Sequence, residues 1–156
     1  MTTVLPENLY QPGYELAEAL REQSVSLAVR PTAPNEADRE ELVLKKLGPR
    51  GWGRLHHFRY FYLSGWGESS GRPLSPRALE GFHRFLEGAQ FPEDVTPSLF
   101  FTDSGHLELS WEDSTGAAVQ VEFTPSAAEF YQAASEREGS VNYANLPELL
   151  RELSLR

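Results

Sequence analysis

The 156-residue chain suits one domain with a single core, and its 40% hydrophobic and 24% charged residues are ordinary for a globular protein. It contains no cysteine, which excludes disulfides, thiolate catalysis and cysteine-ligated zinc. The net charge of −9 disfavours direct nucleic-acid binding and favours a basic protein partner, although the same charge also fits a role in solubility alone.

The chain is predicted to start with an irregular arm over residues 1–13, where Pro6 and Pro12 restrict the backbone. Apolar residues at helical spacing predict a helix over residues 14–23, and apolar alternation predicts a strand over residues 25–29. The start lacks a basic region followed by an apolar stretch, and no apolar run is long enough for a membrane span. We therefore expect a cytoplasmic protein without membrane association.

Two helices are predicted next. Asn35 is a suitable cap for a helix over residues 36–47, which the Gly-Pro pair at 48–49 should end. The Gly-Trp-Gly sequence at 51–53 predicts a further break. Over residues 54–63 the apolar spacing favours a helix, whereas the aromatic content favours a strand; we favour the helix.

A loop rich in Gly, Ser and Pro is predicted over residues 64–76, and Ser75 with Pro76 should begin a helix that runs to about Ala89. Beyond it the apolar periodicity changes to that of strands joined by turns at 103–105 and 113–116. The strands are expected at 99–102, 107–111 and 119–123, a strand or short helix at 127–134 with the strand favoured, a loop at 136–141, and a last helix at 146–153.

The predicted fold is therefore a single α+β domain over residues 1–156, with helices packed on one face of a three- to four-stranded antiparallel meander. Alternation along the strands should turn one apolar face toward the helices and leave the other in water. The apolar face is expected to comprise Leu107, Leu109, Trp111, Val119, Val121 and Phe123.

No catalytic or metal-binding pattern is evident, so we expect a protein that is not an enzyme and needs no cofactor. The adjacent His56 and His57 lack the i, i+4 spacing of a helical zinc pair, and phosphate-binding and nucleophile-elbow glycine motifs are absent. Glu108 and Glu122 can face each other across two strands, but on a solvated face no raised pKa is expected. A small enzyme assembled from His56, Glu108 and Glu122 is the remaining catalytic hypothesis.

The polar face of the meander is the candidate interface, since a flat acidic sheet suits basic side chains of a partner. A merely solvated face is the alternative. Trp66 is a second candidate, as an interface anchor if exposed and as a packing residue if buried. The candidate partner-binding residues are Trp66, Asp103, His106, Glu108, Glu112 and Glu122.

Several local patterns occur in a recognisable order: the Gly-Trp-Gly loop at 65–67, a Pro-Leu-Ser-Pro helix start, and a hairpin whose strands end in Trp111 and in Glu122-Phe123. Over about residues 55–131 this order resembles small bacterial and phage-borne antitoxin- or immunity-like proteins. The resemblance implies a non-enzymatic protein that neutralises a basic toxin or nuclease by occlusion. An inhibitor whose acidic surface mimics nucleic acid is the alternative.

Overall fold

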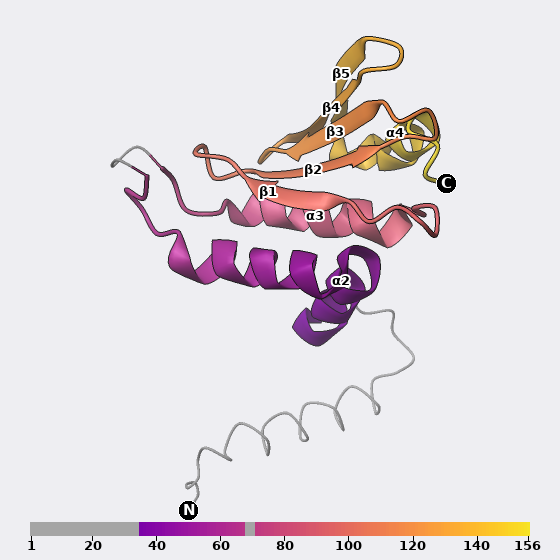
Figure 1. Cartoon of the computed structure of the whole chain (residues 1–156). Helices are drawn as coiled ribbons and strands as arrows, with labels where there is room; N and C mark the ends of the chain where they lie inside the picture. Colours follow the sequence, from indigo (N-terminus) through magenta and orange to yellow (C-terminus); the bar gives the residue numbers. More distant parts are fainter. Residues whose placement is uncertain (1–34, 68–70) are drawn as a thin grey trace, which may run out of the picture. The chain divides into compact units, whose positions relative to one another are not determined.

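In the computed structural model, which describes residues 35–67 and 71–156, the helices precede and follow a run of strands (Figure 1). The arm, helix and strand expected over residues 1–29 lie outside the described residues. The described elements are α2 (Glu36–Phe61), α3 (Pro76–Gly88), β1 (Ser98–Phe101), β2 (Leu107–Glu112), β3 (Ala118–Phe123), β4 (Ala127–Gln132), β5 (Arg137–Asn142), a 3-10 turn (Tyr143–Asn145) and α4 (Leu146–Glu152).

Helix α2 begins as expected and ends later than expected. The Asn35 side chain accepts a hydrogen bond of 2.8 Å from the Asp38 amide, which caps the first turn. At Gly48 the backbone has a φ of 78°, and the helix kinks there instead of ending. Pro49 then starts a second helical segment, where its fixed φ is favourable and its missing N–H costs nothing. The predicted break at 51–53 is therefore wrong, and the predicted helix over 54–63 is confirmed as far as Phe61.

Helix α3 is confirmed at both ends within one residue. Ser75 Oγ accepts from the Ala78 amide at 3.2 Å, and Pro76 follows the cap directly. Phe82, Phe85 and Leu86 are fully buried on its inner face. Within the described ranges, no helix is both long enough and apolar enough to cross a bilayer.

The sheet of the described residues has five antiparallel strands in the order β1-β2-β3-β4-β5, rather than three or four. Residues 127–132 form a strand, as favoured, but residues 137–142, predicted as a loop, form β5. Every β5 residue except Val141 is exposed, so the strand has no apolar alternation to detect. Backbone pairing with β4 positions it, since Phe130 lies opposite Gly139 and Glu129 opposite Ser140.

The helices lie on one face of this sheet, which makes the fold α+β as predicted (Figure 1). α3 contacts β2 and β3, α2 contacts β1 and α3, and α4 contacts α3 and β5. All six side chains of the predicted apolar face are buried in the core that the helices and sheet share. The opposite face, which we call the outer face, carries the side chains that alternate with them.

Candidate functional site

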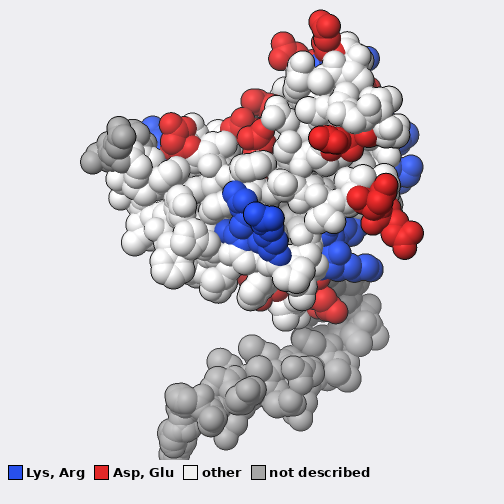
Figure 2. Space-filling model, viewed as in Figure 1, with Lys and Arg blue, Asp and Glu red and all other residues white. Residues whose placement is uncertain are grey.

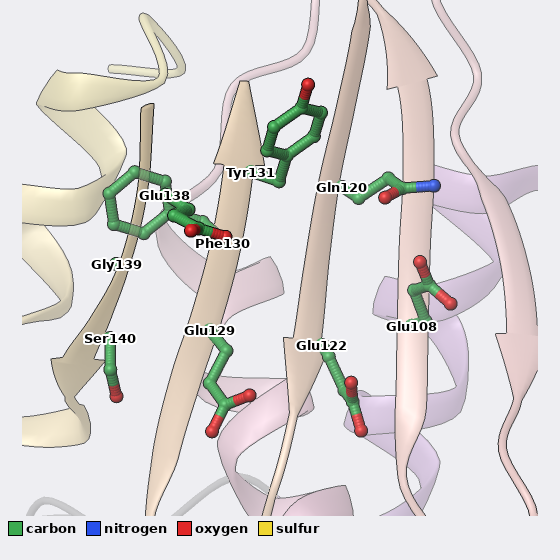
Figure 3. A pocket seen from close by; sticks show the side chains of 9 residues that line it. All are labelled: Glu108, Gln120, Glu122, Glu129, Phe130, Tyr131, Glu138, Gly139 and Ser140. Carbon is green, nitrogen blue, oxygen red and sulfur yellow. The ribbon is translucent and has the colours of Figure 1, made fainter. Parts of the chain in front are cut away.

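Three glutamates form a line across the outer face. Glu108 of β2 lies opposite Glu122 of β3, and Glu122 lies opposite Glu129 of β4. Figure 3 shows these side chains projecting from neighbouring strands, which are spaced about 4.8 Å apart in any sheet. We call Glu108, Glu122 and Glu129 the glutamate row. Phe100 extends the line on β1 and Ser140 extends it on β5.

The outer face is hollowed beside the glutamate row. A depression of about 440 Å³ is lined by the row together with Gln120, Tyr131, Glu138 and Ser140. The β4–β5 hairpin stands at a steep angle to β1 and β2 and forms one side of it (Figure 1). Strand twist of this kind converts a flat face into a concave one. The surface therefore offers an open acidic depression rather than a deep pocket.

The glutamates of the row differ in their electrostatic environment. Burial by its neighbours, and then the charge of Glu122, raise the pKa of Glu108 above its ordinary value. The expectation that this face would raise no pKa is therefore wrong. Glu122 Oε2 lies 2.7 Å from His106 Nδ1, which compensates its charge when the imidazole is protonated. Among the described residues, no Lys or Arg forms an ion pair with the row.

The structure brings three of the predicted interface residues together and separates the others. His106, Glu108 and Glu122 are neighbours on the outer face. Glu112 shares this face but lies at the far end of β2, opposite Ala118. Asp103 is exposed in the β1–β2 turn, where its carbonyl accepts a 3.0 Å hydrogen bond from the Arg72 amide.

Trp66 lies on the helix side of the sheet and packs within the chain. Its ring stacks on Phe101 at 5.3 Å and meets Tyr62 edge-on at 4.7 Å. Its indole Nε1 donates to the Arg72 carbonyl at 2.7 Å. This partly buried ring holds the loop after α2 against the sheet, as the packing alternative proposed, and it is not part of the outer face.

Sequence reasoning missed Glu129, Tyr131 and Glu138. Glu129 and Tyr131 alternate with buried Ala128 and Phe130. Once residues 127–132 are assigned as a strand, this alternation predicts that Glu129 and Tyr131 lie on the outer face. Glu138 has no such signal, because both of its neighbours in β5 are exposed as well.

The hypothetical catalytic set does not assemble. His56 lies on α2 between the rings of Trp52 and Tyr60, at 5.7 and 4.8 Å. Glu108 and Glu122 lie on the sheet face that the helices leave open. In the described part of the chain, no group of three or more His, Asp or Glu residues is arranged to hold a metal ion.

No family model, curated protein sequence or solved structure matches this chain, so its function is inferred from the outer face itself.

Proposed function

We propose that this protein is an antitoxin-like binding protein, without catalytic activity of its own, that occludes a basic partner with the outer face of its sheet. The observation that carries the proposal is the glutamate row. Carboxylates placed directly opposite one another on adjacent strands destabilise a sheet by about 0.2–1 kcal/mol per pair. Local rules of this kind are broken chiefly at functional sites. Lys or Arg side chains of a partner would remove the repulsion on binding.

The aromatic residues of the outer face support an interface over a merely solvated surface. Phe100 and Tyr131 are 40% and 38% exposed; Phe100 lies at the β1 end of the glutamate row and Tyr131 lies beside the row, opposite Gln120. Aromatic side chains that are buried on binding supply much of the energy of protein interfaces, and charged groups supply orientation and rate. Tyr131 lines the depression together with the glutamate row, and Phe100 lies next to Glu108 at the edge of the outer face.

The proposed mechanism is steric. The negative field of the chain accelerates encounter with a basic toxin or nuclease in the cytoplasm. Docking then covers basic residues that such a partner uses to hold its substrate. The acidic charge and the resemblance to antitoxin-like proteins both favour this function, and neither requires chemistry by the protein itself.

The test is co-expression with the product of the adjacent gene, followed by growth and co-purification. We expect the neighbour to be toxic alone, harmless with this protein, and co-eluted with it. The double variant Glu108→Lys, Glu122→Lys should lose both protection and co-elution. Glu41→Lys with Glu87→Lys is the matched control, because both residues are exposed on helices and the net charge changes equally.

Three results would change the proposal. A harmless neighbour that does not co-elute would reject the antitoxin function. Equal loss of protection by both double variants would mean that total charge, and not the outer face, determines binding. A co-eluting nuclease that DNA displaces from the outer face would favour the nucleic-acid-mimicking inhibitor instead.

A further inference from the structure

A second surface of this acidic chain has the opposite charge. A groove of about 410 Å³ lies between the C-terminal half of α2 and strand β1, and we call it the α2–β1 groove. Arg50 and Arg54 line it from α2, and Thr96 and Ser98 line it from the β1 side. Figure 2 shows basic side chains gathered on this face of the molecule, between the positions of α2 and β1 in Figure 1.

The two arginines of the groove differ from the other arginines of α2. Arg39 pairs with Glu80 at 2.8 Å and Arg59 pairs with Glu36 at 2.6 Å. Within the described ranges, neither Arg50 nor Arg54 has a carboxylate partner. In a chain with 23 acidic and 14 basic residues, two neighbouring arginines without such a partner are available to an external anion.

Arg54 is also held in position before any ligand arrives. Its guanidinium carbon lies 5.0 Å from the centre of the Phe100 ring and 5.8 Å from that of Phe58. Stacking on aromatic faces restricts the guanidinium plane without using its N–H donors. A preordered donor loses less conformational entropy on binding, which favours affinity for a carboxylate.

The floor of the groove is apolar. Leu47 and Leu99 line it and are 1% and 0% exposed, and Gly51 packs directly against the Leu47 side chain. The apolar surface within reach of a ligand is that of Phe100, which is 40% exposed. Arg50, Ser98 and Phe100 are exposed at the rim. A ligand that fits this arrangement carries an acidic group beside an apolar group, as do acidic peptides that contain aliphatic or aromatic residues. A phosphate backbone offers no apolar group for Phe100, and the net charge of −9 opposes it.

We propose that the α2–β1 groove binds an acidic, partly apolar segment of a partner protein, with Arg50 and Arg54 contacting its carboxylates. This site adjoins the outer face at Phe100, which lines the groove and lies opposite Glu108, and it has the opposite charge preference. The protein would then present two surfaces to its surroundings, one for basic and one for acidic protein groups.

The test is panning of a phage-displayed random peptide library against the full chain. We expect enriched peptides to place Asp or Glu next to an apolar residue. Labelled copies of these peptides, measured by fluorescence anisotropy, should bind Arg50→Glu at least 10-fold more weakly than wild type. Arg54→Lys should show a smaller loss, because Lys keeps the charge but not the planar stacking.

The controls separate this site from other effects. Arg77→Glu makes the same charge change at an exposed position of α3 and should bind as wild type. The outer-face variant Glu108→Lys, Glu122→Lys should bind the acidic peptides at least as tightly as wild type, because it removes negative charge beside the groove, so failure of one proposal is distinguishable from failure of the other. Arg50→Gln serves in place of Arg50→Glu if thermal melting shows that the latter is unfolded.

Four outcomes of the binding measurements would overturn the proposal. They are no enrichment, enriched peptides without acidic residues, equal peptide affinity for wild type and Arg50→Glu, and tighter binding of a short DNA oligonucleotide than of the peptides. Sedimentation that shows wild-type dimers dissociated by Arg50→Glu would identify a second copy as the occupant, and would equally overturn it.

Discussion

Glu108 is a carboxylate whose charge costs stability. Its pKa is raised, so the native state binds a proton at Glu108 more tightly than the unfolded chain does. The loss of stability caused by the charge is therefore present above the folded-state pKa of Glu108 and disappears as the pH falls through that pKa. We expect Glu108→Gln to increase the free energy of unfolding at pH 7 by about 0.5 kcal/mol, measured by urea denaturation. Glu122→Gln should give no such gain, because it also replaces the charged carboxylate that contacts His106 with a neutral amide. A loss of stability in Glu108→Gln would contradict repulsion within the row.

His83 is a buried histidine that the fold holds neutral. It is 2% exposed, and its Nδ1 has no hydrogen-bond partner in the described structure. Burial, and then the charge of Arg39, lower its pKa from 6.5 to about 4. The unfolded chain therefore binds more protons between these two pH values, and stability must fall as the solution is acidified across that window.

The corresponding prediction concerns the slope of stability with pH. Protonation of His83 should lower the wild-type free energy of unfolding by up to about 3 kcal/mol as the pH falls from 6.5 to 4. In His83→Leu this part of the pH dependence should be absent. Denaturant unfolding at several pH values measures it. His57→Gln is the control, since it removes an exposed histidine from α2 without altering the interface with α3. Parallel profiles for wild type and His83→Leu would show that His83 does not titrate in this way.

At the scale of the element, the kink in α2 depends on one glycine. A methyl group added at Gly48 or at Gly53 would meet no atom within 4 Å, but only Gly48 has a positive φ. Gly48→Ala should therefore destabilise by about 1–3 kcal/mol, because the backbone there, with φ 78° and ψ 178°, lies in a region that is essentially restricted to glycine. Gly53→Ala should stabilise by about 0.5–1 kcal/mol through helix propensity. Thermal unfolding of the two variants measures the difference, and shifts of the same sign would refute the role of the kink.

Elements with internal periodicity were predictable, and those specified by their neighbours were not. Leu107, Leu109 and Trp111 alternate clearly, and the Ser75 cap with Pro76 marks the start of α3, so β2 and α3 were expected where they occur. The exposed side chains of β5 carry no such pattern. At the kink of α2, a Gly-Pro pair that usually ends a helix instead joins two helical segments, because Pro49 also suits a first turn.

The candidate site, like the fold, was predictable only in part. Alternation along β2 and β3 placed Glu108 and Glu122 on one face, and their pairing follows from the short turn between the strands. The third member of the row, Glu129, depends on assigning β4. The raised pKa of Glu108 was not predictable, because it arises from burial by side chains of neighbouring strands and not from its own segment.

At the scale of the molecule, two surfaces of the described residues carry opposite charge. The outer face carries the glutamate row and Glu138, whereas the α2–β1 groove carries Arg50 and Arg54. The net charge of −9 therefore describes neither surface by itself. A basic partner is attracted to the outer face over a distance set by the ionic strength, about 8 Å at physiological salt.

This arrangement predicts that charge and aromatic residues act on different rate constants of the proposed complex. Replacing the glutamate row by Gln should lower the association rate of the purified partner at least 10-fold at low salt and flatten its salt dependence. Tyr131→Ala should leave the association rate nearly unchanged and raise the dissociation rate about 10-fold or more, because it removes a contact made only after docking. Surface plasmon resonance over a salt series separates the two constants. The opposite result, in which Tyr131→Ala slows association and the Gln variant only accelerates dissociation, would contradict this assignment. The carboxylates would then not steer the encounter.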